Sequence, residues 1–92
     1  MQRVENLEEA RNFQEYGSRG IPLIMLSEGE EGVVSEIHCG RGLRRRLAEM
    51  GFSLGERVRM IRNHSPGPVM VEVRDSRVSL GRGVSMKVVV YA

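Results

Sequence analysis

The chain has 92 residues and is poor in cysteine, aromatic residues and long apolar runs. Its one cysteine, Cys39, excludes an internal disulfide, and a lone thiol suits the reducing cytoplasm. The longest apolar run, residues 21–26, is far shorter than the roughly 20 residues that cross a bilayer, so we expect no direct membrane insertion. With four aromatic residues and no tryptophan, the chain offers no row of stacking platforms for single-stranded bases.

Motifs for catalysis are absent from the sequence as well. No Walker A, G-x-S-x-G or C-x-x-C pattern occurs, and residues 40–43 (GRGL) lack the spacing and the lysine of a phosphate loop. Two histidines and one cysteine are the only side chains that titrate near neutrality. We therefore expect a protein that is not an enzyme.

The positive charge is mild and comes almost entirely from arginine. The formal net charge is +2, and residues 21–92 contain eleven basic against eight acidic residues. Nucleic-acid-binding domains usually carry a larger, clustered excess of positive charge, so this composition makes nucleic acid an improbable partner.

From residue 21 onward, apolar and polar residues alternate in short β-branched runs separated by glycine, proline or the Arg-Asp-Ser-Arg segment 74–77. These runs lie at residues 33–37, 58–61, 69–73, 78–80 and 88–91. Five short strands at this spacing predict a mainly β fold, a small antiparallel barrel with a closed sheet.

Residues 1–20 differ from this pattern. Asn6 and Glu9 have the spacing of a capping box, which predicts a short helix with a narrow apolar stripe. We therefore divide the chain into an N-terminal appendage, residues 1–20, and a barrel domain, residues 21–92.

The segment GLRRRLAEMGF, residues 42–52, breaks the strand pattern. Leu43, Leu47 and Met50 lie at i, i+4 and i+7, which predicts one helix over about 42–50 with its leucine face on the barrel. Gly51 is placed to end this helix in the left-handed conformation, with Phe52 folding back onto Leu47. The arginine triplet then forms the solvent face of the helix.

Two other interpretations of the polar residues stay open. His38, Cys39 and His64 carry the donor atoms that Zn²⁺ or Fe²⁺ prefers and form a tentative metal site. Adjacent residues of a strand point to opposite faces, so His38 and Cys39 share one ion only where the strand has ended.

The arginines present the second open question. Arg41 and the triplet could join the strand arginines in one continuous positive face, namely Arg41, Arg44, Arg45, Arg46, Arg57, Arg59 and Arg62. Such a face would bind RNA or an acidic protein, because guanidinium groups pair bidentately with carboxylates.

The order of these elements resembles the FeoA family, ferrous iron transport protein A. The resemblance covers residues 22–92 and rests on RRRLAEMGFSLGERVRMIRN, a Gly-Pro turn and VMVEVRDSRVSLGRGVSMKVVV. Two family features are missing, because Leu54 replaces a common proline and no aspartate separates Gly67 from Pro68. Residues 81–85, where the family is rich in charged helix formers, are expected to form a plain loop.

The resemblance implies an SH3-like barrel that serves as a cytoplasmic accessory to the membrane iron transporter FeoB. Such a protein binds the GTP-binding domain of the transporter, regulates uptake without chemistry, and reaches the inner membrane only through this partner. The resemblance also implies an alternative, a metal-sensing domain like the SH3-like C-terminal domain of iron-dependent repressors. We assign partner binding to the exposed side of the helix: Arg41, Arg44, Arg45 and Glu49. Open barrel edges would also permit self-association.

Overall fold

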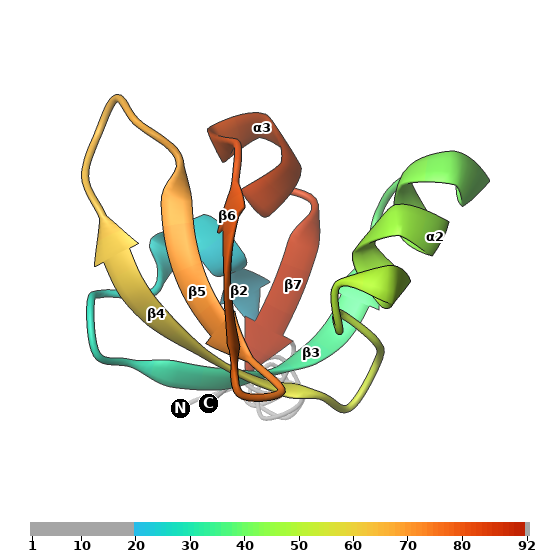
Figure 1. Cartoon of the computed structure of the whole chain (residues 1–92), viewed down its shortest axis with the longest axis horizontal. Coiled ribbons are helices and arrows are strands. Elements are labelled where there is room, and N and C mark those ends of the chain that lie inside the picture. Colours follow the sequence, from blue (N-terminus) through green and yellow to red (C-terminus); the bar gives the residue numbers. More distant parts are fainter. Residues whose placement is uncertain (1–19, 92) are drawn as a thin grey trace, which may run out of the picture.

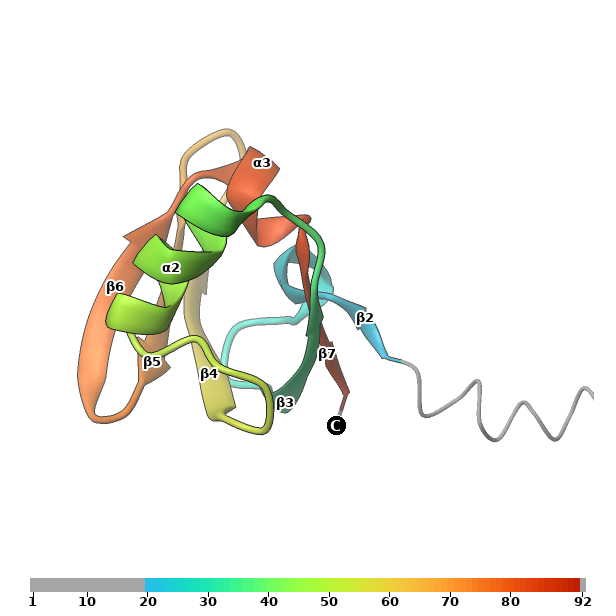
Figure 2. The same cartoon turned by 90° about the vertical axis from the view of Figure 1, so that its right-hand side faces the viewer.

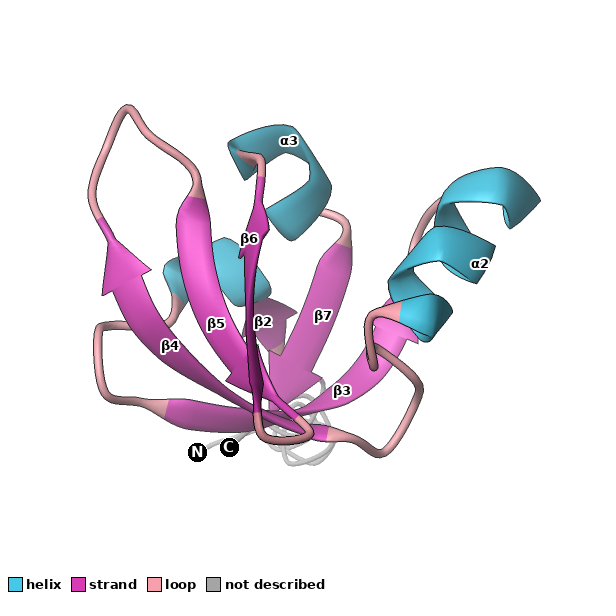
Figure 3. Ribbon diagram, viewed as in Figure 1, coloured by secondary structure: helices cyan, strands magenta, loops and turns pink. Residues whose placement is uncertain are grey.

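The computed structural model describes residues 20–91, and the predicted N-terminal helix lies outside them. Six strands, two α-helices and one 3-10 turn follow one another in this part of the chain (Figures 1 and 3). They are β2 (Ile21–Pro22), η1 (Leu23–Met25), β3 (Glu31–Ile37), α2 (Arg41–Glu49), β4 (Arg57–Asn63), β5 (Val69–Val73), β6 (Ser76–Leu80), α3 (Arg82–Ser85) and β7 (Val88–Tyr91). The prediction of a mainly β fold is confirmed.

All six strands belong to one antiparallel sheet in the order β2-β7-β3-β4-β5-β6. The sequence predicted about five strands, and the sixth is β2, which contains only two residues and shows no alternation. The expected closure of the sheet was wrong: within residues 20–91, β6 does not pair back onto β2. The barrel is therefore open between these two edges.

Valines on the strands make up half of the buried hydrophobic core. Val69, Val71 and Val73 of β5 are buried, whereas Met70 and Glu72 between them are partly exposed. This is the period of two that the sequence predicted. The pairing registers shift between Val34 and Glu36 and between Met60 and Arg62, and such bulges bend a strand, which fits the strong curl of the sheet in Figure 1.

The turn between β5 and β6 is tighter than the sequence indicated. Arg74 and Asp75 have φ angles of 53° and 66°, the pattern of a two-residue type I′ hairpin turn. Ser76 and Arg77, expected in the turn, instead begin β6.

The predicted helix at about 42–50 is α2, which begins one residue earlier and ends at Glu49. The predicted glycine end is also present, because Gly51 has a φ of 105°. Phe52 N–H donates to Leu47 O at 2.9 Å and Gly51 N–H donates to Ala48 O at 3.0 Å, the two bonds of a Schellman motif. Leu47 and Phe52 are fully buried in the same core cluster, while Leu43 and Met50 are half-buried beside it.

The expected loop at 81–85 was wrong, because Arg82–Ser85 forms the helical turn α3. Ser85 N–H donates to Gly81 O at 3.0 Å, and the Ser85 hydroxyl donates to Arg82 O at 3.0 Å. Ser85 is fully buried and Val84 packs against the core. Tertiary packing therefore outweighs the poor helix propensity of Gly83.

The burial of Leu47 predicts a large stability loss when its side chain is shortened. Leu47→Ala lowers the free energy of unfolding by about 2–5 kcal/mol, because a fully buried leucine leaves a cavity. Urea denaturation measures this loss. Leu54→Ala is the matched control: Leu54 is 61% exposed, so the same truncation changes stability by less than about 0.5 kcal/mol. Equal losses in both variants would contradict the packing described here.

Two glycines, one just after the end of α2 and one inside it, predict opposite effects of substitution on stability. Gly51 has a positive φ, which is unfavourable for a residue with a side chain, and an added Cβ would lie 3.1 Å from the Arg74 side chain. Gly51→Ala therefore lowers the free energy of unfolding by about 1–2 kcal/mol. Gly42, inside the same helix, has no atom within 4 Å of such a Cβ. Gly42→Ala therefore raises stability by about 0.5–1 kcal/mol. Thermal unfolding of both variants checks the signs, and a shared sign refutes the explanation.

Candidate functional site

The arginines of α2 form the candidate docking surface. Arg41, Arg44, Arg45 and Arg46 are all exposed, and Glu49 is the one acidic residue of the helix. Figure 2 shows α2 along the outside of the barrel, in front of the β5–β6 hairpin. Within residues 20–91, no arginine of α2 forms an ion pair with a carboxylate. The positive charge of the helix is therefore not neutralised by ion pairs within this part of the chain.

The position of Arg41 at the start of the helix increases the local positive potential there. Gly40 caps α2 without a side-chain hydrogen bond, and the first turn contains no acidic residue. Arg41 thus lies next to the positive end of the helix dipole, where an acidic side chain would stabilise a helix better. The dipole and the guanidinium groups together favour the approach of a carboxylate.

Arg44 has a role that the sequence did not reveal. Its guanidinium Nη2 donates to the carbonyl oxygen of Ile37, the last residue of β3, at 2.6 Å. This bond ties α2 to the strand that precedes it and fixes how the helix leaves the sheet. Among the predicted partner-binding residues, Arg44 is therefore also a structural link, whereas Arg41, Arg45 and Glu49 make no side-chain hydrogen bond within the described chain.

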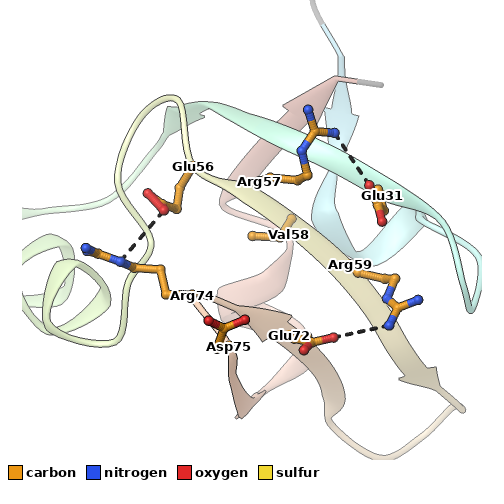
Figure 4. A pocket seen from close by; sticks show the side chains of 8 residues that line it. All are labelled: Glu31, Glu56, Arg57, Val58, Arg59, Glu72, Arg74 and Asp75. Carbon is orange, nitrogen blue, oxygen red and sulfur yellow. Dashed lines mark hydrogen bonds and ion pairs between the residues drawn. The ribbon is translucent and has the colours of Figure 1, made fainter.

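Two arginines of β4 and one of the β5–β6 turn differ, because each forms an ion pair with an acidic residue. Arg57 pairs with Glu31 at 3.5 Å, Arg59 with Glu72 at 3.3 Å and Arg74 with Glu56 at 3.7 Å (Figure 4). These pairs line a hollow of about 440 Å³ that also includes Val58 and Asp75. With four carboxylates and three guanidinium groups around it, this hollow is not a positive surface.

These pairs weaken the hypothesis of one continuous positive face at two of its seven arginines. Arg57 and Arg59 have their own acidic partners on the sheet, while the arginines of α2 have none in residues 20–91. Of the seven arginines, Arg57 and Arg59 are therefore paired with carboxylates, whereas Arg62 of β4 and the four arginines of α2 form no ion pair within residues 20–91.

The structure does not bring the tentative metal ligands together. His38 follows the end of β3 and His64 follows the end of β4, and the ends of two antiparallel neighbours point in opposite directions. His38 Nε2 lies 2.7 Å from Glu36 Oε1, and His64 Nε2 lies 2.9 Å from Glu28 Oε2. Cys39 is half-buried against the core. Residues 20–91 contain no group of three or more His, Cys, Asp or Glu side chains placed to hold one metal ion.

A polar network around Asn63 was also invisible in the sequence. Its amide Nδ2 donates to Ile24 O at 2.8 Å and to Leu26 O at 3.0 Å, and its Oδ1 accepts from Arg82 Nη2 at 3.1 Å. Arg82 Nη1 donates to Gly67 O at 2.9 Å. This network joins η1, β4, the β4–β5 turn and α3, so we assign Asn63 and Arg82 to structure.

No helix within residues 20–91 is long and apolar enough to cross a membrane. The fold and its surface together define a small, open antiparallel barrel with one basic helix on its outside. A sequence profile described as the FeoA domain matches residues 21–92, and the chain belongs to the FeoA family.

Known relatives agree with this family. A protein of Methanocaldococcus jannaschii, whose name marks it as a candidate Fe(2+) transport protein A, is 41% identical over 69 residues, which are 75% of this chain and 83% of that protein. The crystal structure of an iron uptake regulatory protein, FeoA, matches with a TM-score of 0.74 and 30% identity. That match covers 77% of this chain and 95% of the other.

A third relative supports the expected fold type. The FeoA of Stenotrophomonas maltophilia, crystallised with zinc and described as a prokaryotic SH3 domain protein, matches with a TM-score of 0.64 and 33% identity. The match covers 74% of this chain and 86% of that chain. The SH3-like fold that the resemblance implied is thereby confirmed, with the open edges described above.

The bond from Arg44 to Ile37 predicts different effects for neighbouring arginines. Arg44→Ala lowers the free energy of unfolding by about 1 kcal/mol, because the Ile37 carbonyl loses its charged donor. Arg45→Ala removes the same atoms from a side chain without such a bond and changes stability by less than about 0.5 kcal/mol. Urea denaturation of both variants measures the difference. An equal effect of the two substitutions would show that the bond does not anchor the helix.

Proposed function

We propose that the protein is a cytoplasmic accessory protein of ferrous iron uptake that docks, through α2, on the GTP-binding domain of an FeoB-type membrane transporter. It regulates uptake by binding and performs no chemistry of its own. It reaches the inner membrane only through the transporter. The observation that carries this proposal is the set of exposed α2 arginines without carboxylate partners in residues 20–91.

The physical basis of docking is charge complementarity. Arg41 and Arg45 offer guanidinium groups that pair bidentately with carboxylates, and Arg41 lies at the positive end of the helix dipole. Arg44 anchors the helix to Ile37 O, so the guanidinium groups of Arg41 and Arg45 are held on a helix whose orientation is set before the partner binds. A prearranged charged surface speeds encounter with an acidic partner and selects against basic ones.

Membership of the FeoA family supports the link to iron transport. Fe²⁺ enters this proposal as the cargo of the transporter. His38, Cys39 and His64 have suitable donor atoms, but no three such side chains gather around one position in the described residues. The donor geometry therefore favours partner binding over metal sensing.

Nucleic acid is the weaker candidate for the same surface. The chain has only two phenylalanines and two tyrosines to stack on bases. Two of the three β4 arginines that would extend a phosphate-binding track, Arg57 and Arg59, are paired with Glu31 and Glu72. The four arginines of one short helix form a small area of positive charge, which suits a cluster of carboxylates on a protein better than the extended backbone of a nucleic acid.

Charge reversal on α2 tests the proposal. Arg41→Glu combined with Arg45→Glu turns two attractions into repulsions, and each exposed ion pair contributes about 0.2–1 kcal/mol. We therefore expect the affinity for the GTP-binding domain to fall by about tenfold, or about 1.4 kcal/mol. Isothermal titration of that domain with each variant measures it.

The matched control carries the same change in net charge at a different place. Arg62 and Lys87 are exposed and form no ion pair within residues 20–91, so Arg62→Glu with Lys87→Glu should leave the affinity within about twofold of the parent. Circular dichroism confirms that both double variants are folded. Equal affinity of the α2 variant and the parent, or equal weakening by the control, would remove α2 as the docking surface.

A further inference from the structure

The two edges of the open sheet are not alike. The edge strand β2 has two residues, one of which is Pro22, and short strands and prolines are common devices that keep an edge from pairing with another chain. The opposite edge strand, β6, has five residues without proline. Its register with β5 runs without a bulge from Val73↔Ser76 to Val69↔Leu80. Within the described chain, β6 therefore lacks the protection that β2 has.

The hairpin geometry determines which backbone groups of β6 point outward. A two-residue turn makes the flanking pair, Val73 and Ser76, a hydrogen-bonded pair, and such pairs alternate along the ladder. Val78 and Leu80 then bond to β5, while Arg77 and Ser79 direct their N–H and C=O groups away from it. Two residues of β6 thus present four backbone groups at the edge.

These four groups have no partner in residues 20–91. No turn, loop or cap bond reaches the backbone of Arg77 or Ser79, and no side chain bonds to either residue. Both residues are exposed, and β6 runs along the front of the molecule in the view of Figure 1. The edge is a row of backbone donors and acceptors ready for another strand.

We infer that β6 pairs with β6 of a second copy of this chain, antiparallel about a two-fold axis at Val78. In this register Arg77 faces Ser79 of the second copy, and the four outward groups on each side form four backbone hydrogen bonds. Val78 meets its own equivalent at the close, non-hydrogen-bonded position in the centre. No like charges lie directly opposite each other, because each Arg77 faces a serine.

The sequence of β6 makes this register self-complementary. Moving the pairing by two residues, so that the axis passes through Arg77, would place two arginines directly opposite each other, which is unfavourable. Moving it toward Leu80 would take Arg77 beyond the paired segment and leave its outward groups unbonded. The arrangement centred on Val78 avoids both losses. The interface is small, so the dimer is weak, with a dissociation constant on the order of 0.1–1 mM.

Substitutions at Ser79 of the full chain test this pairing by sedimentation equilibrium over roughly 10 µM to 1 mM. Ser79→Glu places a carboxylate opposite Arg77 twice in each dimer and should lower the dissociation constant about 2- to 30-fold. Ser79→Lys places a cation there and should raise it by a similar factor. Ser79→Pro removes an outward N–H without breaking a bond to β5, so it should abolish the dimer.

Controls separate edge pairing from general effects of charge and from misfolding. Arg77→Ala in the Ser79→Glu background should cancel the gain, because the new carboxylate loses its partner. Ser53→Glu adds the same charge in the α2–β4 loop and should leave association unchanged. A gain of association by Ser79→Glu cannot come from unfolding if circular dichroism is that of the parent.

Two results overturn the inference. One is a monomer at every concentration in both the parent and the Ser79→Glu variant, whether or not β6 accepts a strand from a different protein. The other is a dimer that keeps its dissociation constant in folded Ser79→Lys and Ser79→Pro variants, because its interface would then lie elsewhere.

Discussion

Burial of Leu47 and Phe52 is the interaction on which the rest of the structure depends. The sheet ends at β2 and β6 without pairing them, so the strands alone do not close the barrel. Leu47 and Phe52, both fully buried, supply apolar volume from the α2 region. They reach the core together because Gly51 reverses the chain at a φ of 105° and Phe52 N–H bonds to Leu47 O. An isolated helix of nine residues is unstable in water, so the burial of Leu47 and Phe52 also stabilises the helix itself.

The same anchoring orients the opposite side of the helix toward solvent. Leu47 in the core and the bond from Arg44 to Ile37 O hold the helix against the barrel at two points, and Arg41 and Arg45 lie on its exposed side. A binding surface on a fixed helix loses less conformational entropy on docking than one on a flexible loop. Packing in the interior and charge on the surface are therefore coupled through the same nine residues.

Local patterns in the sequence predicted most of the fold. The period of two in β5, the leucine spacing of α2 and the glycine after it are patterns within a few neighbouring residues, so they can be recognised in the sequence. β2 and α3 were missed or mistaken because tertiary contacts form them: β2 exists by pairing with β7, and α3 through the burial of Ser85. The hydrogen bond from Arg44 to Ile37 could not be predicted either, because an arginine within a basic triplet is expected to be exposed to solvent.

The candidate docking surface illustrates the same limit for charge. Fourteen basic and twelve acidic residues nearly cancel, so composition alone does not identify a functional arginine. The antiparallel register places Glu31 and Glu72 on either side of Arg59, and such neighbours neutralise one another across strands. A single helix on the outside of a sheet has no cross-strand neighbours, and α2 has only one acidic residue of its own. Within residues 20–91 its arginines form no ion pair with a carboxylate, and this distinguishes them from Arg57 and Arg59 of β4.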